Sequence, residues 1–219
     1  MPQKCTVKRP RGGVPGAQRI LSAAERLFAQ HGFSGASVHS IAMAAGVSKA
    51  TVFHHFRSKE MLYREVLAAA SREFSKQISM LPQDGAALHR CVELFASRQL
   101  EHMLRRSQVS RIVLREIVDG GTQRSLRLTA HVLAENFARL VDLLKGGQAT
   151  GLVRADVDCA AAACVLIAAN VFFFQTRRVL PYLPGVSFGE DPGAYSCVTT
   201  AVVLSGILDK CTRGADQRS

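Results

Sequence analysis

The chain has 219 residues, 47% of them hydrophobic, and a formal net charge of +11. That apolar content is sufficient for a packed core, and the length suits one or two domains. The first fifteen residues are basic and rich in Pro and Gly, with no apolar segment behind them, which excludes a secretory signal of the usual pattern. We therefore expect a cytoplasmic protein.

The positive charge is concentrated at the start of the chain. Residues 1–60 contain nine Lys and Arg against Glu25 and Glu60, a balance of +7, whereas residues 61–219 contain nineteen against fifteen, a balance of +4. A basic first quarter indicates contact with a polyanion, and nucleic acid is the usual one. The alternative is a charge excess that only keeps the protein in solution.

The first helix is predicted over residues 17–31. Gly32, directly after it, is expected to end the helix, because glycine tolerates the left-handed turn that closes many helices. The apolar residues of this segment repeat at helical spacing, which predicts that the helix buries one face. That stripe consists of Ile20, Leu21, Ala24, Leu27 and Phe28.

Two short helices with a sharp turn between them are predicted next. Ser37 is expected to cap the second helix, since its hydroxyl can accept a hydrogen bond from a free backbone N–H group. Residues 45–47 form the turn around Gly46, and Ser48 is expected to cap the third helix. Two helices joined in this way in a basic segment indicate a helix-turn-helix. The inward positions are Val38, Ile41, Ala42 and Ala45 on the second helix and Val52, Phe53 and Phe56 on the third.

The third helix keeps a polar side outside once its apolar side chains are buried. The residues on that side are hydrogen-bond donors with small spacers, so they can approach phosphates and base edges closely. They are Lys49, Ala50, Thr51 and His54, followed by His55 and Lys59.

A fourth helix is predicted from Ser58, its expected cap, toward residue 80. Its inward positions are Met61, Leu62, Val66 and Leu67.

Longer helices follow from Pro82 onward. Residues 86–105 and 107–119 form a predicted pair, and residues 122–145 form the next helix, which residues 145–147, Lys-Gly-Gly, are expected to stop. The apolar positions of the helix over residues 122–145 are spaced alternately three and four apart, which predicts a seam for packing against nearly antiparallel helices. The seam consists of Leu126, Ala130, Leu133, Phe137, Leu140 and Leu144.

The most apolar run of the chain, residues 159–174, is 16 residues long and contains Asn170. A bilayer requires about 20 such residues, so we expect a buried core helix over residues 157–180 and no contact with a membrane. Asp156 is expected to cap this helix, and Pro181 is expected to end it.

Residues 181–193 are rich in Pro and Gly and are predicted to be a loop. Asp191 followed by Pro192 indicates the start of the last helix, because proline in the first helical position loses no hydrogen bond. This helix is expected to run to about Cys211 and, together with residues 157–180, to form a four-helix interface with a second copy of the chain. Its interface positions are Tyr195, Val198, Ala201, Val202, Ser205 and Gly206, with Ile207 or Leu208.

Three motifs follow one another without a break in residues 19–62. They are AAxxLFxxxGF at Ala23 to Phe33, SVxxIAxxAGVSKxT at Ser37 to Thr51, and aromatic-His-His-Phe-x-Ser-Lys-Glu at Phe53 to Glu60. This segment resembles the DNA-binding domain of the TetR family of bacterial repressors. The rest of the chain is similar to the family's ligand-binding domain in helical layout more than in motif.

We therefore expect an all-α fold of about nine helices in two domains. Residues 1–62 would form a basic arm and a three-helix helix-turn-helix domain, and residues 63–219 a ligand-binding and dimerisation domain. The resemblance implies a homodimeric, ligand-responsive transcriptional regulator, in the first place a repressor that a small effector releases from a palindromic double-stranded DNA operator. The second domain has few candidate buried charges, so a hydrophobic or aromatic effector is expected.

The resemblance also implies which residues contact DNA. The second and third helices would touch it at their starts, and the two histidines would bind backbone phosphate beside the start of the fourth helix. His39 takes a place where the family often has arginine, so it is expected to reach a base edge. A basic arm before the first helix suits a minor groove. The expected DNA-binding residues are Arg9, Arg11, Ser37, His39, Ser48, Lys49, Ala50, Thr51, His54, His55 and Lys59.

The expected effector pocket lies in the second domain and is lined mostly by apolar side chains. The lining residues predicted for it are Cys91, Phe95, Met103, Ile112, Phe137, Cys164, Phe172 and Tyr182.

Metal, catalytic and cofactor functions find little support. His54 and His55 point about 100° apart on a helix, and no Cys or acid lies three or four residues after either of them, so no metal site is expected. A nucleophile elbow, HExxH, a P-loop and GxGxxG are all missing from the sequence, and we predict neither an enzyme nor a cofactor.

Two alternatives remain open. One is a helical ligand-binding or adaptor protein of the same fold that does not bind DNA. The other is a regulator that senses redox state through cysteine. The six cysteines include no CxxC pair and are expected to pack as small hydrophobic residues, with Cys5 the most exposed.

Overall fold

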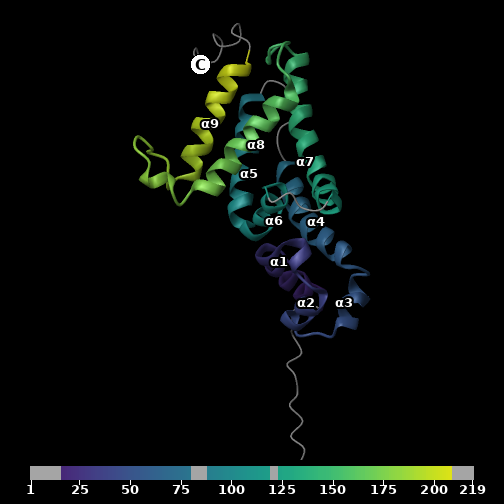
Figure 1. Ribbon diagram of the computed structural model, residues 1–219. Helices are drawn as coiled ribbons and strands as arrows, with labels where there is room; N and C mark the ends of the chain where they lie inside the picture. Colours follow the sequence, from purple (N-terminus) through teal and green to yellow (C-terminus); the bar gives the residue numbers. More distant parts are fainter. Residues whose placement is uncertain (1–15, 80–87, 119–122, 209–219) are drawn as a thin grey trace, which may run out of the picture. The chain divides into compact units, whose positions relative to one another are not determined.

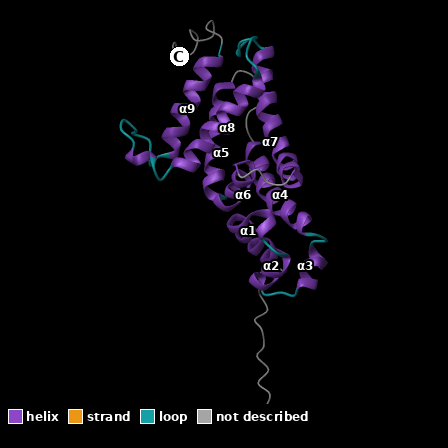
Figure 2. Cartoon of the chain, viewed as in Figure 1, coloured by secondary structure: helices purple, strands orange, loops and turns teal. Residues whose placement is uncertain are grey.

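The computed structural model describes residues 16–79, 88–118 and 123–208 (Figures 1 and 2). All regular structure in these residues is helical, apart from an isolated bridge between Val153 and Leu208. The all-α prediction is confirmed. The helices are α1 Gly16–Gly35, α2 Val38–Ala45, α3 Lys49–His55, α4 Lys59–Ile78, α5 Leu88–Arg105, α6 Ser107–Val118, α7 Gln123–Ala149, α8 Cys159–Thr176, the 3-10 helix η2 Leu180–Tyr182, and α9 Pro192–Ile207.

The chain divides into two compact units within α4, residues 1–66 and residues 67–219. Each unit is described here by itself. The functional boundary expected after residue 62 remains a prediction.

The first unit is built around the buried face of α1. Ile20, Ala24 and Phe28 are buried there as predicted, whereas Leu21 and Leu27 are half-buried at the edge of the stripe. The helix does not end at residue 31. Gly32 interrupts it with a φ of 71° and a ψ of 177°, a backbone conformation that favours glycine, and one further turn continues to Gly35.

Three aromatic rings close the core of the first unit. Tyr63 of α4 is fully buried, and its ring lies 5.0 Å from the ring of Phe28 and 5.0 Å from that of Phe33, with edge-to-face geometry toward both. The sequence prediction missed Tyr63 and placed Met61 inside instead. Met61 is exposed, because it lies about 100° around the helix from Leu62, which is the buried neighbour.

The prediction that Phe53 points inward is also wrong. Its side chain is 40% exposed, and α3 buries Val52 and half-buries Phe56 instead. A helix of seven residues offers one narrow face to its neighbours, and Val52 occupies it, while Phe56 follows the helix as its C-cap with an extended backbone.

The second unit has one main apolar core. In this unit α5 packs against α8 and α9, and α7 packs against α8 (Figure 1). The fully buried side chains of Val92, Leu140, Leu144 and Ala163 come from three of these helices. The core therefore joins segments that are far apart in the sequence.

Helix α7 continues through the expected stop at Gly146 and Gly147 and ends at Ala149. A Cβ atom added to Gly147 would lie 2.4 Å from Cδ2 of Leu88 and 3.0 Å from Cγ2 of Val153, so glycine at this position permits close packing. The chain turns afterwards at Gly151, whose φ is 76°. The predicted end of the helix at these glycines was wrong, because the sequence does not distinguish a glycine inside a helix from one that ends it.

The seam predicted for α7 is correct only in its second half. Leu140 and Leu144 are fully buried and Phe137 is half-buried, but Leu126, Ala130 and Leu133 are exposed. Among the side chains that the structure describes up to the middle of the helix, the buried ones are instead polar. They are Ser125, Thr129 and Asn136.

Helix α8 begins later and ends earlier than predicted. Its cap is Asp158, whose carboxylate accepts hydrogen bonds from the N–H groups of Ala160 and Ala161, whereas Asp156 pairs with Arg154. The helix ends at Thr176, and Pro181 lies in η2 within the predicted loop.

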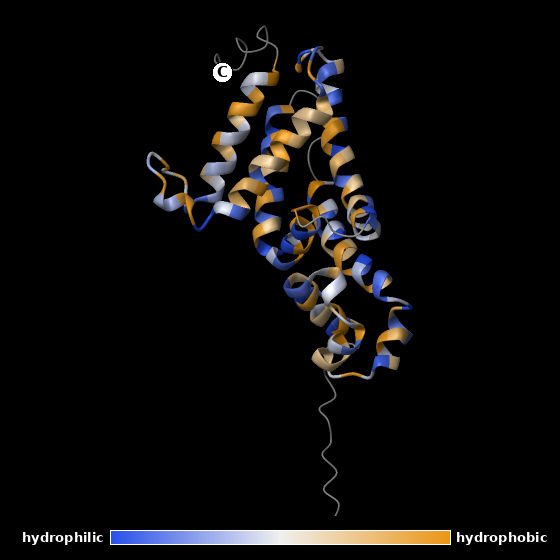
Figure 3. Cartoon of the chain, viewed as in Figure 1, coloured by the Kyte–Doolittle hydropathy of each residue, from blue (hydrophilic) through white to orange (hydrophobic). Residues whose placement is uncertain are grey.

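By length and composition alone, α8 could span a membrane, and Figure 3 shows its hydrophobic character. Its mean hydropathy is 1.8, but 39% of its residues are buried inside the protein. Asn170 anchors it there, because the side-chain amide donates hydrogen bonds to the carbonyl of Ala96, at 2.9 Å, and to Oε1 of Gln99, at 2.8 Å. These bonds to α5 support the interpretation as a core helix.

The start of α9 agrees with the prediction. The Asp191 carboxylate accepts hydrogen bonds from the N–H groups of Gly193 and Ala194, and Pro192 occupies the first turn. The helix ends at Ile207, and Cys211 lies outside the described residues. Tyr195, expected at the dimer interface, is buried in its own chain, where its hydroxyl donates to the carbonyl of Ala169.

Candidate nucleic-acid interface

Serine caps define the starts of α2 and α3. The Ser37 hydroxyl accepts a hydrogen bond from the Ser40 N–H at 2.9 Å, and the Ser40 hydroxyl accepts one from the Ser37 N–H at 3.2 Å. Ser48 accepts a hydrogen bond from the Thr51 N–H at 3.0 Å, and its hydroxyl lies 2.9 Å from that of Thr51. These bonds fix the ends of both helices and hold the predicted contact residues in place.

Gly46 makes the turn between these helices. Its φ of 65° and ψ of 39° are left-handed, and its N–H group bonds to the carbonyls of Ala42 and Met43. Such a conformation is costly for other residues, which explains glycine at this point.

The outer surface of α3 carries five of the eleven predicted DNA contacts. Lys49, Ala50, His54 and His55 are exposed, and Thr51 is half-buried. The ammonium group of Lys49 lies 5.9 Å from the centre of the Phe53 ring, so a cation and an aromatic face share this surface. His39, on α2, is exposed as well.

His55 lies beside the start of α1, and His54 lies next to His55. Their rings are 5.4 Å apart in edge-to-face geometry, and a Cβ atom at Gly16 would lie 3.5 Å from Nε2 of His55. The first amides of a helix attract anions, so this Nε2 and the start of α1 can serve one phosphate together. Among the described residues, no group of three His, Cys, Asp or Glu comes together to hold a metal ion.

Lys59 is less available than predicted. Its Nζ atom donates a hydrogen bond to the carbonyl of Ser34, at 3.3 Å, and lies 4.7 Å from the centre of the Phe33 ring. Burial lowers the pKa of Lys59, and Glu60 partly offsets that shift. Lys59 therefore ties the start of α4 to the end of α1, and Ser58 caps α4 by accepting from the Met61 N–H.

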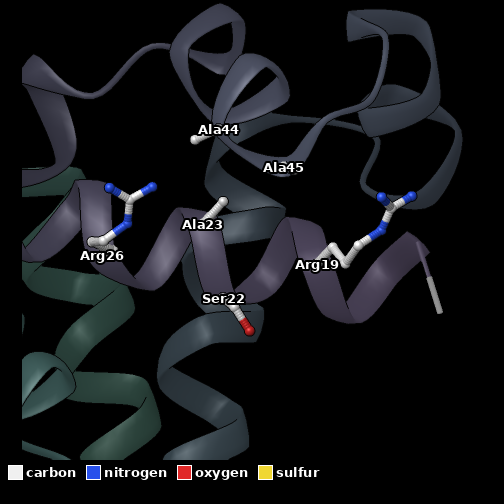
Figure 4. A pocket seen from close by; sticks show the side chains of 6 residues that line it. All are labelled: Arg19, Ser22, Ala23, Arg26, Ala44 and Ala45. Atoms are coloured by element: carbon white, nitrogen blue, oxygen red, sulfur yellow. The ribbon is translucent and has the colours of Figure 1, made fainter. Parts of the chain in front are cut away.

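A pocket with two arginines lies between α1 and α2 (Figure 4). Its volume is about 330 Å³, and its lining contains no acidic residue. Figure 4 shows both guanidinium groups extending from α1 on either side of Ala23, toward the side of Ala44 and Ala45. Sequence reasoning missed Arg19 and Arg26, although their seven-residue spacing could have placed them on one helix face.

Arg9 and Arg11 lie outside the described residues, so the basic arm stays a prediction.

The residues predicted to line an effector pocket differ in how deeply they are buried. Cys91 and Phe95 on α5 and Ile112 on α6 are buried, and Met103 and Phe137 are half-buried. The side chains of Cys164, Phe172 and Tyr182 are exposed in the single chain, and the lining as a whole stays a prediction.

The expectation that cysteines pack as small hydrophobic residues is confirmed for Cys91 and Cys159. It is wrong for Cys164 and Cys197, which are exposed free thiols on α8 and α9.

An all-helical chain whose basic first unit is a serine-capped helix-turn-helix is a DNA-binding transcriptional regulator. A family profile described as "Bacterial regulatory proteins, tetR family" matches residues 20–66. The transcriptional regulator RutR of Escherichia coli K12 is 32% identical over 148 residues, which are 66% of this chain and 69% of RutR. The chain belongs to the TetR family, which confirms the resemblance.

Other relatives agree with this assignment. The transcriptional repressor NicS of Pseudomonas putida is 27% identical over 161 residues, covering 73% of this chain and 75% of NicS. The fatty acid degradation regulator FadR from Bacillus halodurans shares the fold, with a TM-score of 0.67, 18% identity, and coverage of 89% of this chain and 97% of FadR. The ketosteroid transcriptional regulator KstR2 of Mycobacterium tuberculosis also shares the fold, with a TM-score of 0.65, 21% identity, and coverage of 92% of this chain and 100% of KstR2.

Proposed function

We propose that this chain is a cytoplasmic homodimeric repressor that binds a palindromic operator through α3 and leaves it when a small molecule binds in the second unit. The observation that carries the proposal is the outer surface of α3, where Lys49, Ala50 and His54 stand exposed beside two serine-capped helix starts. This surface combines charge, small residues and hydrogen-bond donors, as a helix in a major groove requires.

Phosphate and base contacts divide between different parts of the first unit in this proposal. His55, Lys49 and the start of α1 bind the DNA backbone, and Thr51 faces the groove. The exposed ring of Phe53 is suited to an apolar contact with a thymine methyl group. Arg19 and Arg26 add positive charge on the neighbouring face of α1.

Dimerisation through α8 and α9 is supported by their exposed faces. In α8 these faces present Val165 and Phe172, and in α9 they present Val198 and Val202, all exposed in the single chain. Small residues at Ala201, Ser205 and Gly206, which are also exposed, allow close approach of a second copy. Two copies would double the length of DNA that is read, since one short helix contacts few base pairs.

Release by an effector follows from linkage. An effector that binds the DNA-incompetent arrangement of the dimer more tightly must weaken DNA binding, and DNA must weaken effector binding by the same factor.

Selection of DNA duplexes from a random pool tests the proposal. The full-length protein should enrich one two-fold symmetric sequence, with half-sites about one helical turn apart centre to centre. Enrichment of no sequence, or of an asymmetric site bound by a single chain, would contradict it.

A further inference from the structure

The inward face of α7 changes character along its length. Leu140 and Leu144 are fully buried in the apolar core, but Ser125, Thr129 and Asn136 occupy the buried positions nearer the start of the helix. Buried polar side chains are costly unless they are hydrogen-bonded. Their partners therefore decide whether this face is structural or is a binding site.

Asn136 is fully engaged with α4. The hydroxyl of Ser75 donates to Oδ1 of Asn136 at 2.7 Å, and Nδ2 of Asn136 donates to the hydroxyl of Ser71 at 3.0 Å. Both ends of the amide have partners, so this part of the face is a closed structural network.

Glu116 of α6 is less well satisfied. Its side chain is only 5% exposed. Among the described residues, this carboxylate accepts a hydrogen bond from the Ser125 hydroxyl, which donates to Oε2. A carboxylate has about four acceptor sites, and burying its charge with one neutral donor costs several kcal/mol. Glu116 can therefore accept hydrogen bonds from further donors.

Thr129 provides a second and independent indication. It is 3% exposed, and its Oγ1 atom is enclosed without a hydrogen-bond partner among the described residues. Thr129 follows Ser125 by four residues, so both hydroxyls lie on the same face of α7. Thr129 is an unpartnered buried hydroxyl one turn from Ser125, which in turn bonds to the Glu116 carboxylate, and this is the pattern of a site that lacks its ligand.

We propose that Glu116, Ser125 and Thr129 form the polar end of the effector site and select an effector with a protonated amine on an apolar body. The carboxylate takes the ammonium group, and the hydroxyls take its remaining N–H donors. Ile112 precedes Glu116 by four residues on α6 and is buried, so an apolar surface adjoins the polar end. This inference rests on the proposed function and adds a charged group to the mostly apolar effector expected from the sequence.

Three probes of one shape test the choice of head group. They are 2-phenylethylamine, 2-phenylethanol and phenylacetate, titrated by calorimetry into the full-length protein at pH 7. The amine should bind at least tenfold more tightly than the alcohol, as a hydrogen-bonded charge pair predicts, and phenylacetate should bind most weakly.

Variants test whether the preference for the amine comes from the Glu116 carboxylate. Glu116→Gln keeps the shape of the side chain and should reduce the amine's affinity to that of the alcohol, whereas Thr129→Val should reduce it less. Glu190→Gln removes an exposed carboxylate from the loop before α9 and should change nothing.

Several results would overturn the proposal. These are equal binding of the three probes, tighter binding of phenylacetate, binding of none of them, or an amine preference that survives Glu116→Gln. The comparison of probes on the unaltered protein needs no variant to fold. Operator binding is measured separately in the same samples, so loss of the proposed function is distinguishable from failure of this inference.

Discussion

At the scale of single residues, the first unit separates two kinds of aromatic side chain. Phe28 is fully buried against Tyr63, whereas Phe53 stands at the surface of α3 beside Lys49. The sequence assigned both phenylalanines to the core, because hydrophobicity alone does not report which way a seven-residue helix faces. The buried ring of Phe28 therefore contributes to the stability of the fold, whereas the exposed ring of Phe53 is accessible to a DNA contact.

We expect Phe28→Ala and Phe53→Ala to differ in their cost. Phe28→Ala should lower the free energy of unfolding by about 3–5 kcal/mol, because it leaves a cavity. Phe53→Ala should change it by less than about 1 kcal/mol but weaken operator binding. Urea denaturation of both variants measures the difference, and a similar loss of stability in the two would place Phe53 in the core after all.

His102 links protonation to folding in the second unit. Burial lowers its pKa below 6.5, Glu73 partly opposes that shift, and Arg105 and Arg106 add to it. Its ring also lies against Phe74, at 5.4 Å between centres. The unfolded chain takes up a proton near pH 6.5 and the folded chain resists it, so this contribution to stability is complete above that pH and is lost below it.

The measurement for His102 is the urea midpoint at pH 7.5 and at pH 5.0. His102→Gln should lose less stability between these values than the unaltered protein does. His131→Gln, which changes an exposed histidine of α7, is the control and should behave like the unaltered protein. Identical losses in all three proteins would show that His102 does not contribute.

At the scale of elements, local chemistry was predictable and distant packing was not. The caps at Ser37, Ser48 and Asp191 were predicted correctly, because a side chain bonds to a backbone only two or three residues away. The inward face of α7 was chosen wrongly over its first half. Two adjacent stripes were available there, and partners on other helices, such as Glu116 of α6, decide between them.

The candidate site shows the same limit. The exposed donors of α3 follow from helical spacing and the family resemblance, but the contact of Lys59 with Phe33 depends on the fold of the whole unit. The burial of the expected effector lining was not predictable at Cys164, Phe172 and Tyr182 for the same reason, since apolar residues can lie at the surface as well as in a core.

The end of α7 offers a matched pair of glycines. Gly147→Ala should lower the free energy of unfolding by about 1–3 kcal/mol, because the added methyl group would meet Leu88 and Val153. Gly146→Ala meets nothing within 4 Å and should be neutral or stabilising by up to about 1 kcal/mol. Thermal unfolding of the two variants measures this, and equal effects would contradict the role of Gly147 in packing.

At the scale of the whole molecule, the proposed function depends on two copies acting together. Apolar side chains of α8 and α9 are exposed among the described residues, and a DNA-reading dimer would cover them. Val202→Arg places a charge on this surface, where Val202 is 67% exposed, and should give a monomer with weak operator binding. Val179→Arg alters another exposed valine, outside both helices, and we expect it to leave the dimer intact.

Sedimentation velocity of these two variants measures the oligomeric state directly. A dimer that persists in Val202→Arg would move the interface away from this face of α9.

The central claim is that the outer surface of α3 holds the DNA backbone, and one titration tests it most directly. A fluorescent duplex of the selected operator is titrated with protein at several salt concentrations. We predict affinity that falls steeply with salt, and for Lys49→Ala a weaker affinity with a slope reduced by about one. Lys76→Ala, which removes an exposed charge from the second unit, should bind like the unaltered protein. Binding that is independent of salt, or equal effects of the two substitutions, would contradict the account.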